Sequence, residues 1–170
     1  LYMDKYYYPP DLYADYAIEA PTATGTDTIP FAGTPEISSA ALTFGLTLPQ
    51  SQHFTGNTTV WINDGMNFDE WTNGYFFLWR SPLVWRPTNQ ARIEASFTRQ
   101  QNLRKVDKST VRIRDLPRLK IEYQLTRAIF FRFVGQYDAT KVDDLRDDTR
   151  TENPILIRDS DGIYQPALAW

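Results

Sequence analysis

From residue 41 onward, apolar and polar residues alternate with a period of two, which is typical of β-strands whose two faces meet different surroundings. The first run, residues 41–48, carries Leu42, Phe44 and Leu46 on one face and threonine, alanine or glycine on the other. Five more runs of this kind follow at residues 54–63, 74–86, 91–98, 111–125 and 129–138. The pattern therefore predicts an all-β, antiparallel up-and-down meander of six strands.

Short and long connections alternate between these strands. Three short connections, at 49–53, 87–90 and 126–127, close three hairpins, and long polar loops are expected at 64–72, 101–110 and 139–166. Residues 1–38 are interrupted by prolines and are expected to form a long loop or a segment lying in a lumen. Residues 39–170 would then supply the strands, and the fragment 167–170 is expected to start another.

Strand length and loop order together favour a transmembrane β-barrel. A tilted strand needs about 9 to 11 residues to cross the hydrocarbon layer, and most of the runs reach that length. Outer-membrane barrels also alternate tight periplasmic turns with long extracellular loops. The alternative is a soluble β-sandwich in which the same aromatic rings fill the core.

The charged residues fall on the face opposite the apolar residues. On a lipid face, one Arg or Lys at mid-depth would cost about 2 to 4 kcal/mol, so the charged face is assigned to a watery lumen. The charges there would either set the selectivity of a pore or fill a narrow barrel as a structural ladder. The predicted lumen-facing charged residues are Arg92, Glu94, Arg118, Lys120, Glu122 and Arg132. The predicted lipid-facing residues are Leu119, Ile121, Tyr123, Ile129, Phe131, Phe133, Trp79 and Trp85.

Composition narrows the range of partners. Aromatic residues make up 15% and charged residues 23% of the chain, with a formal net charge of −3, and the basic residues form no stripe. A nucleic-acid partner is therefore not expected. Without cysteine, disulfides and thiolate zinc sites are excluded. The longest apolar run, Tyr75 to Trp79, is far short of the roughly 20 residues of a membrane-spanning helix.

Two stretches carry a resemblance to a known family. Residues 121–170, which begin IEYQLTRAIFF, and residues 92–100 resemble the C-terminal region of a bacterial family of unknown function. In that family a carbohydrate-binding-like β-sandwich precedes an outer-membrane barrel. The resemblance covers roughly residues 40 to 170 and implies architecture, a bacterial outer-membrane location and contact with membrane lipid. The sandwich is absent here, so its glycan recognition does not transfer to these residues.

Candidate chemistry is sparse. His53 is the only histidine and lies in a predicted tight turn without an acidic partner, so it is interpreted as a solvated residue and not as part of a catalytic triad. Asp159, Asp161 and Gly162 resemble the start of a calcium loop but lack its later acidic ligand, and an ordinary surface turn is the alternative. The acidic pairs at 143–144 and 147–148 alternate with arginine, which indicates a solvated loop.

The sequence thus predicts an outer-membrane barrel segment with a pore, transport or surface-anchoring role and no catalysis, cofactor or metal of its own. The alternative function is carbohydrate binding by a soluble β-sandwich. Six strands cannot enclose a barrel, which needs about eight. The missing strands are expected from the remainder of the same barrel or from other membrane subunits. Since the chain begins at Leu1 and shows no signal peptide, its start is expected to be missing or processed.

Overall fold

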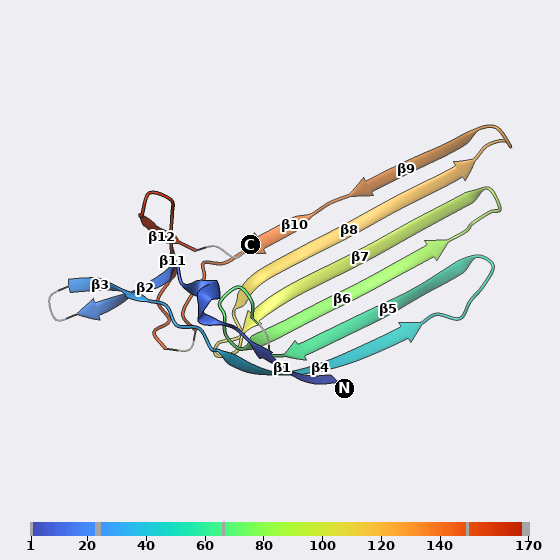
Figure 1. The fold of residues 1–170 in the computed structure, drawn as a ribbon. Helices are drawn as coiled ribbons and strands as arrows, with labels where there is room; N and C mark the ends of the chain where they lie inside the picture. The colour runs from blue at the N-terminus through green and yellow to red at the C-terminus, as the bar shows by residue number, and fades with distance from the viewer. Residues whose placement is uncertain (1, 23–24, 66, 149, 168–170) are drawn as a thin grey trace.

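A large antiparallel sheet forms most of the molecule. The computed structural model describes residues 2–22, 25–65, 67–148 and 150–167. Eight strands form this sheet, in the order β1-β4-β5-β6-β7-β8-β10, and β9 also pairs with β8 (Figure 1). The six predicted strands are confirmed, as is the all-β antiparallel class. They are β4 (Glu36–Thr47), β5 (Phe54–Asp64), β6 (Gly74–Trp85), β7 (Ala91–Arg104), β8 (Thr110–Gln124) and β9 (Phe130–Gln136).

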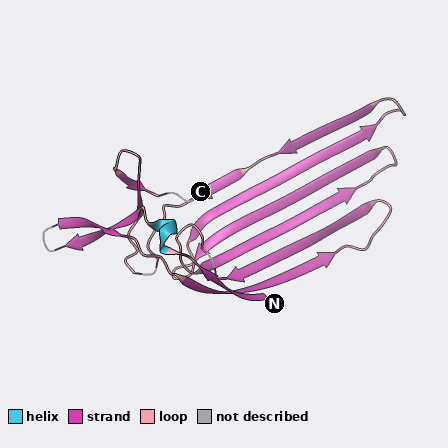
Figure 2. Cartoon of the chain, in the orientation of Figure 1, coloured by secondary structure: helices cyan, strands magenta, loops and turns pink. Residues whose placement is uncertain are grey.

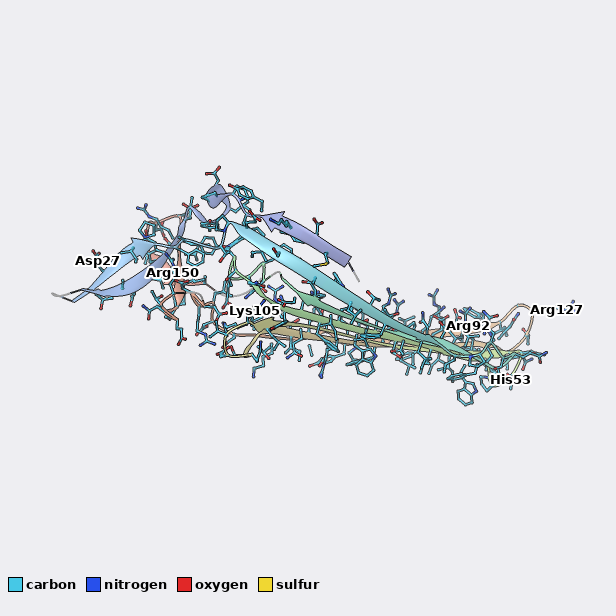
Figure 3. All side chains as sticks on the ribbon, turned by 90° about the horizontal axis from the view of Figure 1, so that it is seen from below. Asp27, His53, Arg92, Lys105, Arg127 and Arg150 are labelled. Carbon is cyan, nitrogen blue, oxygen red and sulfur yellow. The ribbon has the colours of Figure 1, made fainter. Side chains whose placement is uncertain are left out.

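The large sheet is open. At one edge, β1 (Tyr2–Tyr7) pairs only with the first half of β4. At the other edge, β9 pairs with the end of β8 nearer the turns, and β10 (Ala139–Val142) pairs with the stretch before it. Within the described ranges no strand joins the two edges, so the sheet is not closed into a barrel. Figure 3 shows the edge formed by β1 and β4 turning out of the plane of the other strands.

The first 38 residues differ from the expected long loop. They contain β1, the 3₁₀ helix η1 (Pro10–Tyr13), β2 (Tyr16–Thr22), β3 (Gly25–Pro30) and the start of β4. β2 and β3 pair with each other as a hairpin. The other partners are distant in sequence: β1 lies along β4, and β2 also lies beside β11 (Ile155–Arg158). A local pattern of apolar residues carries no sign of such pairing. Most of the prolines that suggested a loop stand at the boundaries of these strands instead.

Two of the three expected long loops differ from the prediction. The first connection, residues 65–73, lies within one residue of the predicted loop 64–72, but β7 continues through Arg104, so the second connection is only residues 105–109. The stretch 139–166 contains β10, β11 and β12 (Tyr164–Pro166). The side chains of Leu145 and Ile155 in this stretch are buried, which its many acidic residues did not indicate. Residues 168–170 of the expected last strand lie outside the described residues.

A second, smaller sheet stands at one end of the large one. Its order is β12-β11-β2-β3, and Figure 2 shows it beside the short helix, away from the hairpin turns. The main apolar core of the molecule lies here. It gathers residues from both ends of the chain, including Tyr8, Tyr13, Ile18, Phe31, Ile37, Val111, Leu145 and Ile155. Trp71 packs against this core, with its ring 5.5 Å from that of Tyr8.

A buried ion pair fixes the loop 65–73 to the end of β7. The side chains of Arg104 and Glu70 have no solvent exposure, and Arg104 Nη2 lies 2.6 Å from Glu70 Oε1. Arg104 also donates to Asp143 Oδ2 and to the carbonyl of Asp144, both at 2.7 Å. Burial raises the pKa of Glu70, although the hydrogen bond from Arg104 opposes that shift. One arginine therefore joins three separate chain segments.

Replacing Glu70 by Gln is expected to destabilise the fold strongly. The guanidinium of Arg104 would stay buried with its closest carboxylate gone, and breaking such a pair costs about 3 to 5 kcal/mol. The free energy of unfolding from urea titration, followed by tryptophan fluorescence, measures this loss. The control is Glu36→Gln, because Glu36 pairs with Lys5 at an exposed site, where an ion pair contributes little. Equal stability of the two variants would contradict the structural role of the buried pair.

Candidate functional site

The six charged residues predicted for a lumen all lie on one face of the large sheet. In the register of β7, β8 and β9, Arg92 stands opposite Glu122, which stands opposite Arg132. One row further along, Glu94 stands opposite Lys120, and Arg118 follows in the next row opposite Ser96. Because residues opposite each other in a sheet share a face, these side chains form one continuous charged surface. We call the side of the sheet that carries it the polar face.

Ion pairs connect most of this surface. Lys120 Nζ lies 2.8 Å from Glu122 Oε1 and 3.1 Å from Glu94 Oε1. Arg92 contacts Glu94 at 2.8 Å, and Arg132 approaches Glu122 at 3.8 Å. Opposite charges directly across a sheet stabilise it. Beside the hairpin turns, the polar face therefore carries an ion-paired ladder of three cations and two carboxylates, in which Lys120–Glu94 and Arg132–Glu122 join neighbouring strands.

The opposite face carries apolar side chains, and nothing among the described residues covers it. We call it the apolar face. Across β8, Ile121 stands between Ile93 and Phe133, and Tyr123 stands opposite Phe131. Phe133 is 59% exposed and Leu46 on β4 is 63% exposed. Figure 3 shows the large sheet nearly edge-on as a single layer with side chains on both sides. The residues predicted to face lipid that are more than a third exposed here are Leu119, Ile121, Tyr123, Ile129, Phe131, Phe133, Trp79 and Trp85.

An ion pair marks the point on the apolar face where apolar side chains give way to charged ones. Arg99 donates two hydrogen bonds of 2.7 Å to the two carboxylate oxygens of Asp115. Both residues lie on the apolar face, one row beyond Phe97 and Pro117. Trp79 stands opposite Arg99, with its ring 5.2 Å from the ring of Phe97. The sequence analysis missed this pair, because Arg99 lies just beyond the predicted strand 91–98 and its pairing with Asp115 follows only from the register of β7 and β8.

The predicted lipid-facing residue Ile129 lies outside the strands. Its carbonyl accepts hydrogen bonds from the backbone N–H groups of Leu125 and Thr126. It therefore belongs to the turn between β8 and β9. That turn is longer than the two residues expected, since β8 ends at Gln124 and β9 begins at Phe130.

The end of the polar face near the small sheet is roofed by the loop 65–73. Asp69 accepts hydrogen bonds of 2.8 Å from Asn102 on β7 and from Arg112 on β8. Trp61 and Phe76 lie beneath it with rings 5.2 Å apart. A cavity of about 280 Å³ remains between this loop and the sheet. Sequence reasoning missed the roof, because nothing in residues 65–73 indicates that the loop folds back over the strands.

His53 holds two turns together. Its Nδ1 lies 3.0 Å from the carbonyl oxygen of Arg86, at the far end of the sheet from the small sheet (Figure 3). The backbone N–H of Arg86 in turn donates to the carbonyl of His53. These contacts connect the turn after β4 to the end of β6. No hydrogen bond or ion pair joins His53 to a carboxylate among the described residues, so no catalytic triad is assembled around it.

Asp159 caps the turn between β11 and β12. One of its carboxylate oxygens accepts hydrogen bonds of 2.9 Å from the backbone N–H groups of Asp161 and Ile163. The other accepts from Gln165 at 3.0 Å, and Gly162 takes a positive φ of 81° in the turn. Within the described ranges no three acidic or histidine side chains converge as metal ligands. The arrangement supports the surface-turn interpretation of this segment.

Comparison of the chain with family models, curated proteins and solved structures finds no match. In the described part of the chain, no helix has the length and hydropathy needed to cross a membrane.

Replacing Asp159 by Ala is expected to loosen this turn. Two backbone N–H groups would lose their acceptor, and a hydrogen bond of this kind contributes about 1 kcal/mol. The amides of Asp161 and Ile163 should then exchange with deuterium at least about fivefold faster, as hydrogen-exchange NMR would measure. Adding calcium to the unaltered protein should leave these rates unchanged. Calcium-dependent slowing of exchange would instead favour the ion-binding interpretation.

Proposed function

We propose that this chain supplies membrane-spanning strands of a bacterial outer-membrane β-barrel, with a pore, transport or surface-anchoring role. The observation that carries the proposal is the two-sided sheet. One face is a broad, uncovered apolar surface, and the other is an ion-paired ladder. Soluble proteins rarely expose a continuous apolar patch larger than a few hundred Å². A bilayer outside and water inside provide each face with a matching environment.

The height of the apolar face fits a bilayer. The apolar positions run from Pro117 on β8 to Leu125, the residue directly after β8, and the Asp115–Arg99 pair lies just beyond Pro117. Nine residues at about 3.3 Å each extend about 30 Å along the strand. A tilt of about 40° reduces this to about 23 Å across the membrane, close to the roughly 25 Å apolar band of outer-membrane barrels. The ion pair would then lie at the polar boundary of the bilayer.

Because both edges of the large sheet are open, the proposed barrel requires further strands. Unpaired backbone groups cost several kcal/mol each in hydrocarbon, so only closed barrels cross membranes as sheets. The free edge of β9 and the half of β4 beyond β1 would therefore pair with further strands. These would come from the remainder of the same barrel or from other membrane subunits. The family resemblance in residues 121–170 is consistent with such an arrangement.

The lengths of the connections between strands indicate how the proposed barrel would be oriented in the membrane. The three hairpin turns lie together at one end of the large sheet, and the small sheet lies at the other end (Figure 1). In outer-membrane barrels the short turns are periplasmic and the longer segments extracellular. The small sheet and the roof formed by residues 65–73 would thus face the outside of the cell. The roof would narrow the outer opening of the lumen.

Extraction and gel migration test the proposal against the soluble alternative. The protein should leave the membrane fraction only with detergent. It should also migrate differently on a gel before and after boiling, because folded outer-membrane barrels resist unfolding by detergent alone. Recovery in the aqueous fraction with one migration position would favour a soluble carbohydrate-binding sandwich and contradict the membrane assignment.

Lysine substitutions at two neighbouring positions of β9 are expected to lower the stability of the protein by very different amounts. Phe133 lies on the apolar face opposite Ile121, and Val134 lies on the polar face opposite Lys120. Phe133→Lys would place a charge in lipid and cost about 2 to 4 kcal/mol. Val134→Lys puts the same group in the lumen and should cost far less. Urea unfolding of the protein in lipid vesicles compares the two. Equal losses would be incompatible with lipid on only one face.

A further inference from the structure

The polar face carries more positive than negative charge. Among the described residues, the strands β6 to β9 place five cations and two carboxylates on this face beside the hairpin turns. This is a formal excess of three positive charges, although the whole chain carries a net charge of −3. The acidic residues are instead concentrated around the small sheet. The five cations are Arg80, Arg92, Arg118, Lys120 and Arg132, and the carboxylates are Glu94 and Glu122.

Two of these cations are left without an acidic partner. The ladder described above engages both carboxylates with Arg92, Lys120 and Arg132. Arg80 and Arg118 form no ion pair within 4 Å among the described residues, and both are exposed. Their positive charge is therefore available to a ligand. A structural ladder alone would require no such excess.

A hollow lies between these two arginines. It has a volume of about 220 Å³ and is lined by four cations, Arg80, Arg118, Lys120 and Arg132, by one carboxylate, Glu94, which Arg92 and Lys120 neutralise, and by shorter side chains of β6 and β7. Arg118 stands opposite Ser96, which stands opposite Pro82, two residues along β6 from Arg80. The short side chain of Ser96 leaves space in the middle of this row. Its hydroxyl makes no hydrogen bond to a described residue.

We infer that this hollow binds the phosphate or carboxylate group of a small anionic solute. A guanidinium presents paired N–H donors that match two oxygens of such a group. Arg80 and Arg118 would supply these donors from two strands, and the Ser96 hydroxyl would add one between them. Lys120 and Arg132 contribute positive potential from the next row. The site would favour the entry and passage of anions over cations.

The role of this site in anion passage rests on the proposed membrane function. Binding of the anion itself can be tested without a membrane. The probe is inorganic phosphate, titrated by calorimetry into the full-length protein in a non-ionic detergent that holds no anionic lipid. Saturable binding that weakens as sodium chloride is added is expected. Absence of saturable binding would overturn the inference.

Matched variants locate the site. Arg80→Gln combined with Arg118→Gln should weaken phosphate binding at least tenfold, and Arg80→Lys with Arg118→Lys should weaken it less. Lys141→Gln, which removes an exposed cation from β10, should leave binding unchanged. Since Arg80 and Arg118 pair with no acidic residue, the variants should fold, and unchanged heat-modifiable migration would verify this. Equal weakening by Lys141→Gln would overturn the assignment.

Bilayer recordings separate this inference from the proposed function. Across a potassium chloride gradient, a reversal potential displaced toward that of chloride would support an anion site in a lumen, and the double Gln variant should reduce the displacement. Cation-selective conductance would overturn the anion inference while leaving the barrel proposal standing. Phosphate binding without any conductance would support the site and contradict the pore role.

Discussion

Each long strand of this chain must satisfy two different environments, because neighbouring side chains project to opposite sides of a sheet. At Leu119, Lys120 and Ile121 the chain alternates between an exposed apolar face and a network of ion pairs. A shift of one residue in register would exchange these faces on the whole strand. The two-sided alternation therefore specifies the register of the strands and which face of the sheet is apolar.

The two ends of the large sheet have different roles. Near the hairpin turns, the sheet is a single layer without a core, and its polar face has unpaired arginines. Near the small sheet, both ends of the chain meet in an ordinary apolar core, and the Arg104–Glu70 pair secures the loop 65–73 above the polar face. In the barrel that we propose, the first end would contact lipid and solutes, and the second would narrow the passage.

The sequence predicted the strands better than the parts between them. β4 to β9 follow a local period of two, so their existence, pairing in hairpins and two faces could be read directly. The pairing of β1 with β4 and that of β2 with β11 join residues more than 25 positions apart, which a local pattern cannot reveal. For the same reason, the sequence did not predict that the loop 65–73 covers the polar face: Asp69 and Arg112, which hold it there, are 43 residues apart in sequence. The alternation along β6 places Arg80 on the polar face, but the sequence alone does not show that Arg80 has no acidic partner there.

Solvent and lipid accessibility along β8 tests the central claim most directly. Spin labels placed singly at positions 116 to 125 of the protein in a bilayer report collisions with oxygen, which enriches in lipid, and with a water-soluble nickel complex. The account predicts that oxygen collisions peak at odd positions and nickel collisions at even positions. Nickel access at both sets of positions, or shielding of the odd positions from both reagents, would show that the apolar face meets water or protein and would contradict it.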